Sequence, residues 1–420
     1  MQPLRGTKDI LPYEIKLWQQ IYNVANEILT ANNYYEIRTP ILENTELFNK
    51  GIGNFTDIVN KEMYSFNDQG ERNITLRPEG TASIARAFIS NKLYLKQKIN
   101  RLWYLGPMFR YERPQRGRQR QFHQLGIECI GSSLPIADVE VIRLAIKTLD
   151  ALGFKEYILE INSIGNMAER DIYKNDLIKY LKLYQNDLDR DSQKKLLTNP
   201  LRILDSKNLN TQTILQQAPK LKNYLNEKSL DHFKYVCNSL KYLNIAYKIN
   251  DYLVRGLDYY NCTAFEIKMK KLSNQNTICG GGRYDTLIEQ LGGPYTPSVG
   301  WAIGIERLIT IKNKNFHLNK PQNIIYIAHQ EILDKYKIWD ILDILENYEI
   351  KFELDLSNNN LYKQIKRANQ MKAKICLILG EEEIKLKYIT IKWLETGTQQ
   401  KIHLSKFYNY LKYIKQQLET

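Results

Sequence analysis

Residues 109–130 read FRYERPQRGRQRQFHQLGIECI. The last ten residues alternate in character, which predicts a β-strand over roughly 121–130. One face of this strand carries an aromatic ring, an amide, a glycine and a carboxylate, namely Phe122, Gln124, Gly126 and Glu128. The other face carries Leu125, Ile127, Cys129 and a single polar member, His123. A second strand is predicted over roughly 101–113, so the two strands indicate an antiparallel sheet with one face turned to a core.

The polar face of this sheet has the character of a binding surface. Gly126 lies between Gln124 and Glu128, and a glycine there lets a ligand approach the backbone closely. Gly106 and Arg110 share a face of the preceding strand. A solvated sheet face is the alternative, but such a face rarely places two glycines in register.

The connection between the two strands is rich in arginine. Residues 110–120 contain five arginines, one glutamate and no lysine. The planar guanidinium grips a phosphate through two hydrogen bonds, whereas an ammonium acts as a point charge. The loop therefore favours phosphate binding over its alternative, a basic surface loop.

The surrounding pattern predicts an α+β domain. A helix over 13–31 precedes a strand at 35–40, and another helix over 81–90 follows Arg77-Pro78-Glu79-Gly80. The dipeptide Gly-Lys never occurs, which excludes a P-loop. Any ATP would have to be held in another way.

Two later changes in composition predict a division into domains. Residues 166–255 contain no glycine, and helical spacing recurs there, which predicts a helical insertion over 166–245. Strands and helices alternate after the polar stretch 312–321, as in an α/β domain with a partly parallel sheet. We therefore expect a first catalytic part at 1–165, a second at 246–320 and a C-terminal domain at 321–420.

Composition narrows the functional classes. The 420 residues carry a net charge of +14, which favours a polyanionic partner or basic solvated helices. The five cysteines lack metal-ligand spacing, so no protein-bound metal is expected. No apolar run is long enough to span a membrane. The N-terminal residues show no targeting signal, so we expect a protein of the cytoplasm or of an organelle stroma or matrix.

Three further segments contain candidate site residues. Residues 253–260 read LVRGLDYY, 279–285 read CGGGRYD and 300–308 read GWAIGIERL. Three successive glycines indicate close approach to a ligand or to another strand, although a flexible loop is the alternative. Arg307 is predicted in the first turn of a helix, where anions are favoured.

Together these segments resemble histidyl-tRNA synthetases, which are class II aminoacyl-tRNA synthetases. Residues 35–40, 109–128 and 304–307 resemble the three motifs of that class. Residues 255–260 and 280–285 resemble the two signatures of the histidine enzymes. The resemblance covers nearly the whole chain, and it implies an antiparallel sheet of six or seven strands with flanking helices and a C-terminal α/β anticodon-binding domain.

The resemblance also implies the role of each site residue. Arg110 and Arg255 would be catalytic, on the α-phosphate of ATP. ATP would be bound by Arg110, Arg118, Phe122 and Arg307, and histidine by Glu79, Thr81, Gln124, Glu128, Tyr259 and Tyr260. Arg113 and Gln115 would face the tRNA acceptor end.

The implied reaction is the ATP-dependent attachment of L-histidine to tRNA(His) through a histidyl-adenylate, with release of AMP and diphosphate. ATP would arrive with Mg²⁺, no prosthetic group is implied, and the enzyme would be a homodimer. Two alternatives remain: a non-catalytic regulatory subunit of ATP phosphoribosyltransferase, which typically lacks the catalytic arginine, and a simple RNA-binding module. The second would not explain the face that carries Phe122, Gln124 and Glu128.

Overall fold

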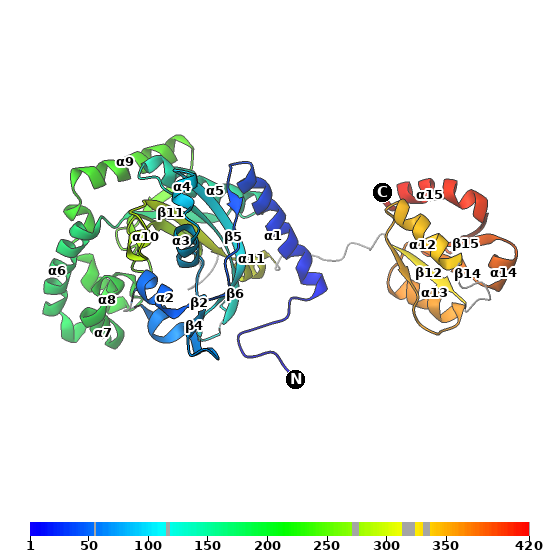
Figure 1. Cartoon of the computed structure of the whole chain (residues 1–420), viewed down its shortest axis with the longest axis horizontal. Coiled ribbons are helices and arrows are strands. Elements are labelled where there is room, and N and C mark those ends of the chain that lie inside the picture. The colour runs from blue at the N-terminus through cyan, green and yellow to red at the C-terminus, as the bar shows by residue number, and fades with distance from the viewer. Residues whose placement is uncertain (54–55, 115–117, 271–276, 313–323, 331–336, 420) are drawn as a thin grey trace. The chain divides into compact units, whose positions relative to one another are not determined.

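The chain folds into two compact units, Met1–Asn315 and Phe316–Thr420, in a computed structural model (Figure 1). The structure describes residues 1–53, 56–114, 118–270, 277–312, 324–330 and 337–419. The predicted boundary at 320/321 lies outside these residues. Each unit is described by itself below.

The first unit is built on a large mixed sheet. Its described strands, in the order in which they lie side by side, are β1 (Tyr35–Glu36), β5 (Asn100–Phe109), β6 (Gln121–Ile130), β11 (Ser298–Gly304), β10 (Thr277–Arg283), β9 (Asn261–Met269), β7 (Tyr157–Ser163) and β8 (Tyr247–Ile249). The six central strands are antiparallel, whereas the short edge strands β1 and β8 pair in parallel. The antiparallel sheet is therefore as predicted, with parallel edges that the sequence did not indicate.

The hairpin of β5 and β6 confirms the predicted alternation. Leu102 pairs with Glu128, Gly106 with Gln124 and Met108 with Phe122. The prediction of a strand to residue 113 was too long, because β5 ends at Phe109. Arg110 therefore lies in irregular chain beyond the strand.

Helices with apolar stripes cover one face of the sheet. They are α1 (Pro12–Thr30), α5 (Pro135–Ala151), α9 (Glu227–Tyr242) and α11 (Ile305–Lys312). Both α1 and α5 begin with proline, whose fixed φ suits the first helical position. These helices share one core with the inward-facing residues of β6, β9, β10 and β11.

The glycine-free stretch forms the predicted helical insertion. Its elements are α6 (Met167–Leu183), η2 (Gln185–Asp187), α7 (Arg190–Thr198), η3 (Pro200–Asp205), α8 (Leu209–Gln216), η4 (Leu221–Tyr224) and α9. Asn166 and Glu169 form a reciprocal capping box at the start of α6. Leu177 and Leu181 of α6 are buried in the same apolar cluster as Tyr260, so the insertion packs directly on the rest of the first unit.

Smaller elements complete the first unit. They are a three-stranded sheet of β2 (Leu42–Asn44), β4 (Asn73–Leu76) and β3 (Tyr64–Asn67), the helices α2 (Thr45–Ile52), α3 (Thr81–Ser90), α4 (Leu93–Lys96) and α10 (Leu287–Gln290), and the π-helical turn η1 (Ile58–Glu62). The N-terminus of α3 points the backbone N–H groups of Thr81 and Ala82 at the Glu79 carboxylate.

The second unit is the predicted partly parallel α/β domain. Its strands are β13 (Phe352–Leu354), β12 (Ile325–His329), β14 (Ile375–Leu379), β15 (Tyr388–Trp393) and β16 (Gln399–His403), in spatial order, with helices α12 (Lys337–Asn347), α13 (Leu361–Gln370), α14 (Glu381–Lys385) and α15 (Leu404–Glu419). The pairs β12/β13 and β12/β14 are parallel, and the remaining pairs are antiparallel. None of the described helices is long and apolar enough to cross a membrane.

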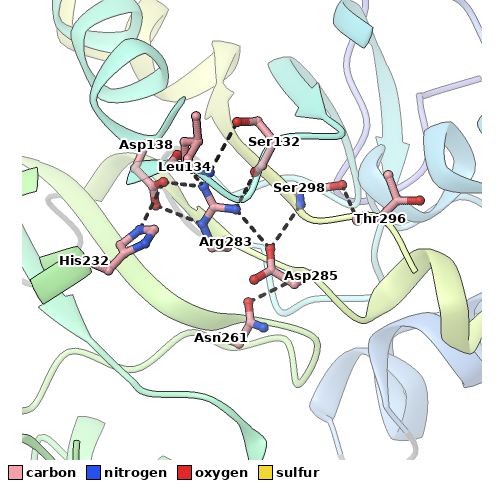
Figure 2. Close-up of polar contacts among 9 residues, drawn as sticks. All are labelled: Ser132, Leu134, Asp138, His232, Asn261, Arg283, Asp285, Thr296 and Ser298. Atoms are coloured by element: carbon pink, nitrogen blue, oxygen red, sulfur yellow. Dashed lines mark hydrogen bonds and ion pairs between the residues drawn. The ribbon is translucent and has the colours of Figure 1, made fainter. Parts of the chain in front are cut away.

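A buried polar network ties the large sheet of the first unit to α5 and α9 (Figure 2). The guanidinium of Arg283, only 1% exposed, contacts Asp138, Asp285 and the carbonyl oxygens of Ser132 and Leu134. Burial alone would raise the pKa of Asp138, but Arg283 and His232 lower it to about 2. A buried charge with all its hydrogen bonds satisfied stabilises one arrangement of the elements around it. Arg283, which belongs to a predicted histidine signature, therefore has a structural role in this buried network.

Candidate active site

A cavity of about 560 Å³ opens on the polar face of the sheet. It collects side chains from the β5–β6 connection, β6, β10, α11 and the chain before β9. Six of the predicted site residues line it, namely Arg110, Arg118, Phe122, Gln124, Arg255 and Arg307. Segments up to about 200 residues apart in sequence thus place four arginines around one space. Together with two lysines they outnumber the four carboxylates of the lining, so the cavity favours an anion.

Arg110 is fixed against the β5–β6 hairpin. Its Nε donates a hydrogen bond of 2.8 Å to Pro78 O, and its guanidinium carbon lies 5.2 Å from the centre of the Phe122 ring. Arg118 is more exposed and pairs with Glu112 at 3.1 Å. One arginine is therefore held in place, while the other has room to follow a ligand.

Arg255 reaches the cavity from the chain before β9. Its Nη1 pairs with Glu266, and its guanidinium lies 5.4 Å from the centre of the Tyr260 ring. Burial alone would lower the pKa of Arg255, but the Glu266 carboxylate raises it above its usual value. The Nε of Arg255 is buried with no hydrogen-bond partner among the described residues. The side chain is thus a charged group at the cavity wall with unused donor capacity.

Arg307 lies in the first turns of α11, as predicted. It donates to the backbone oxygen of Thr277. Burial, together with the nearby Arg118, lowers the pKa of its guanidinium. The preceding residue, Glu306, accepts the backbone N–H of His123 at 2.9 Å and so ties α11 to β6.

A second, fully buried polar cluster adjoins the cavity along β6. Thr81 Oγ1 donates to Glu128 Oε1 at 2.8 Å, and the Tyr284 hydroxyl donates to Glu128 Oε2 at 2.5 Å. Burial raises the pKa of Glu128 to about 8, although the hydrogen bonds from Tyr284 and Thr81 oppose it. The free protein therefore holds a carboxyl group at this point that gains or loses its proton near neutral pH.

Glu79 and the tyrosine pair complete this cluster. Burial raises the pKa of Glu79, and hydrogen bonds from the N–H groups of Ala82 and Thr81 at 2.7 and 2.8 Å oppose the rise. The Tyr259 hydroxyl lies 3.4 Å from Glu79, and the Tyr259 and Tyr260 rings are 4.6 Å apart. Two carboxyl groups and two phenols thus meet where Gln124 and Arg255 border the cavity.

The successive glycines of β10 make room for these side chains. A Cβ on Gly280 would overlap the guanidinium of Arg255, and one on Gly282 would press on the Tyr260 ring. The Glu128 carboxylate likewise occupies the space next to Gly300 of β11, where a Cβ would overlap it. The predicted close approach is therefore confirmed: neighbouring strands approach as well as the site's own side chains, since Gly300 O lies nearest to Gly281 and Thr263 O nearest to Gly282.

The two residues predicted at the tRNA acceptor end do not belong to the cavity as described. Arg113 is exposed in the β5–β6 connection and does not line the cavity, and Gln115 lies outside the described residues. Sequence reasoning assigned no role to Tyr284 or Glu266, which contact Glu128 and Arg255. Their signal was present: Tyr284 belongs to the GGGRYD segment, and Glu266 lies eleven residues after Arg255. Among the described residues, no group of three or more His, Cys, Asp or Glu could hold a metal ion.

This chain is similar to known proteins. The family model for histidyl-tRNA synthetase matches residues 6–308 of this chain. The chain belongs to the histidyl-tRNA synthetase family. A second model, for an anticodon binding domain, matches residues 324–414.

Individual relatives agree with this family. The chloroplastic histidine–tRNA ligase of Gracilaria tenuistipitata var. liui is 63% identical over 97% of each chain. The histidine–tRNA ligase of Cyanothece sp. is 51% identical over 95% of this chain and 93% of its own. The crystal structure of apo S. aureus histidyl-tRNA synthetase has a TM-score of 0.79 and 36% identity, covering 98% of this chain and 99% of that one.

Family membership confirms three predictions made from sequence: the resemblance itself, the α+β fold with its C-terminal domain, and the ligase class of enzyme. Histidyl-tRNA synthetases use ATP, so the arginine-lined cavity has an expected substrate of matching charge.

Proposed function

We propose that this chain attaches L-histidine to tRNA(His) in two steps, through a histidyl-adenylate, with release of AMP and diphosphate. The observation that carries the proposal is the junction of two unlike sites on one sheet. An arginine-lined cavity suited to a triphosphate meets a buried carboxyl and phenol cluster suited to an imidazole.

The cavity supports the assignment of ATP. Phe122 offers a ring face for adenine, and Arg307 is proposed to cover its other side, because guanidinium and aromatic planes stack. Arg118, which is partly exposed, is proposed to follow the terminal phosphates. Arg110 and Arg255 line the cavity from different elements and are proposed to hold the α-phosphate between them.

The buried cluster supports the assignment of histidine. Imidazole has one donor and one acceptor nitrogen, so Glu128 and Tyr260 can hydrogen-bond the two, with Tyr259 nearby. Glu79 and Thr81 are proposed to hold the amino group. The Oε1 of Gln124 is buried without a partner among the described residues, which suits a residue that orients the ligand between the two sites.

In the first step, a histidine carboxylate oxygen would form a bond to the α-phosphorus while the bond to the diphosphate oxygen breaks. Negative charge grows on the phosphate oxygens as this occurs. Each preplaced donor of this kind contributes roughly 3 to 4 kcal/mol to lowering the barrier. ATP would enter as its magnesium complex, and Mg²⁺ would neutralise the departing diphosphate.

Further proposals follow from the family. The terminal adenosine of tRNA would receive histidine in the second step, with Arg113 and Gln115 near the acceptor end and the C-terminal domain on the anticodon. We propose a homodimer. Its place would be the cytoplasm or an organelle stroma, because relatives are bacterial or chloroplastic.

The proposed function predicts that exchange of labelled diphosphate into ATP depends on histidine and does not require tRNA. An RNA-binding module or a regulatory subunit would catalyse no exchange. The control replaces histidine by glutamine, which lacks the ring. Exchange that is independent of histidine, or absent in well-folded protein, would contradict the proposal.

The two-unit organisation predicts separable steps. A chain ending near residue 315 is expected to form adenylate at nearly the full rate, because every proposed adenylation residue precedes 308. Charging of tRNA is expected to fall by about 100-fold or more, because one of two linked binding modules is lost. The measurements are diphosphate exchange and tRNA charging on one preparation, with light scattering to establish its oligomeric state. A folded truncate of unchanged oligomeric state that forms no adenylate would contradict the separation.

A further inference from the structure

Residues 255–260 carry three proposed site residues without any regular secondary structure. Arg255, Tyr259 and Tyr260 all belong to this segment, which precedes β9. A second cavity, of about 190 Å³, lies between the segment and the insertion and is lined by Arg170, Arg202, Arg255 and Tyr260 among others. Tyr259 and Tyr260 are packed in an apolar cluster, but the cavity leaves part of the segment without solid packing behind it, so polar contacts also contribute to its position.

The insertion supplies such contacts at the C-terminal end of the segment. Arg170 of α6 donates to Tyr260 O at 2.6 Å and reaches Asp258 O at 3.5 Å. Asn199, just before η3, donates to the Asp258 carboxylate at 3.0 Å. Burial lowers the pKa of Arg170, and its donors point at carbonyl oxygens of the segment. These contacts fix main-chain atoms directly beside Tyr259 and Tyr260.

Arg202 of η3 makes the contact nearest to Arg255. Its Nη2 donates to Gly256 O, and its Nη1 pairs with Asp57 at 2.8 Å. Asp57 precedes η1 in the N-terminal part of the catalytic unit. The guanidinium of Arg202 therefore joins the insertion to two separate segments of the catalytic unit, at Gly256 and at Asp57. Each of its two terminal nitrogens binds one of them.

The catalytic unit closes on the same segment from the other side. The backbone N–H of Asp258 donates to Ile52 O at 3.1 Å. Gly53 has φ of +101°, and a Cβ there would overlap the Asp258 side chain. The segment thus contacts both Ile52 and Gly53 of the first unit and the insertion.

We infer that the insertion takes part in the first, tRNA-independent step, and that Arg202 is a positioning residue that holds Arg255 in place through Gly256. The inference rests on the proposed function, because it assumes that Arg255 acts in adenylation. It assigns to the insertion a role within the active site, separate from any contact with the acceptor arm of tRNA.

The size of the expected effect follows from geometry. A displacement of about 1 Å at a catalytic group can slow a reaction about 100-fold. Arg202→Ala is expected to slow histidyl-adenylate formation by about 10- to 100-fold without tRNA. The turnover number should fall more than the KM for histidine or ATP rises, because Arg202 touches neither substrate in the proposed site.

The test is single-turnover adenylate formation by the full chain with histidine and ATP, for the parent, Arg202→Ala and Arg202→Lys. Lysine can reach only one of the two partners, so its rate should lie between the others. Arg190→Ala is the matched control, because Arg190 is an exposed arginine of the same insertion and should leave the rate unchanged.

A double variant separates positioning from general damage. If Arg202 acts through Arg255, the two substitutions are coupled and their effects do not add. The double variant Arg202→Ala/Arg255→Ala should then form adenylate less than about threefold more slowly than Arg255→Ala alone. Multiplicative effects, a parent-like rate in Arg202→Ala, or a defect seen only when tRNA is present would each overturn the inference.

Two safeguards keep the outcome decisive. If Arg202→Ala does not fold, Asp57→Asn tests the Arg202–Asp57 pair, and Asn199→Ala tests the neighbouring contact of the insertion with Asp258. If the parent itself forms no adenylate, the proposed function fails. If the parent is active and these variants equal it, only the role of the insertion fails.

Discussion

Arg255→Ala is expected to slow histidyl-adenylate formation by roughly 100- to 1000-fold. In the proposed mechanism Arg255 neutralises the α-phosphate as charge develops there. Histidine affinity should change little, because an interaction made in the transition state affects turnover and not ground-state binding. The later transfer to tRNA, started from preformed adenylate, should be less affected. The measurement is single-turnover adenylate formation at saturating histidine and ATP.

Two further variants show whether the effect of Arg255→Ala comes from the guanidinium group or only from the lost charge. Arg255→Lys should recover only part of the rate, because an ammonium cannot make two parallel hydrogen bonds and has no planar face for the Tyr260 ring. Arg72→Ala, at an exposed hairpin arginine paired with Asp68, is the control for loss of a positive charge. A parent-like rate for Arg255→Ala would leave Arg110 as the single arginine of the α-phosphate.

The sequence predicted the parts of the site that local periodicity determines. Alternation along β6 placed Phe122, Gln124 and Glu128 on one face, and the structure confirms that they lie on the site side. The run of glycines in β10 indicated close approach, since only a missing Cβ allows it. These signals are readable because strand geometry acts on adjacent residues.

Contacts between distant segments could not be read in this way. Nothing in local pattern pairs Thr81 with Glu128, or Arg202 with both Asp57 and Gly256. The role of Arg283 was equally hidden, because an arginine in a glycine-rich segment suggests a ligand until Asp138 is seen beside it. Burial and long-range pairing decide these roles, and both depend on the completed fold.

Strand ends were also misjudged for a physical reason. The strand predicted at 35–40 is limited to Tyr35–Glu36, and β5 ends four residues before 113. Phe109 and Tyr111 continue the pattern of a strand, and the backbone N–H of Arg110 still donates to Arg120 O across the hairpin. The backbone N–H of Tyr111 donates instead to Glu62 O, so a tertiary hydrogen bond ends the strand pairing there.

Glu128→Gln is expected to raise the KM for histidine by roughly 10- to 100-fold while the KM for ATP stays within about twofold. A hydrogen bond to a charged group contributes about 1.5 to 3 kcal/mol, which corresponds to that range. The pKa of Glu128, raised to about 8 by burial, lies above the value of about 6.5 for free imidazole but in the same neutral range. Carboxyl and imidazole can therefore share one proton as a charge-assisted pair, which an amide cannot do.

The pH dependence distinguishes this pairing from a change of shape. For the parent, histidine affinity between pH 6 and 8 should follow the titration of both Glu128 and the ring, whereas the Gln variant should follow the ring alone. Glu27→Gln on the exposed face of α1 is the control for the same chemical change. The amide is nearly isosteric with the carboxyl group and can still meet Thr81 and Tyr284, so the variant is expected to fold. A Gln variant with the parent's KM and pH profile would move imidazole recognition away from Glu128.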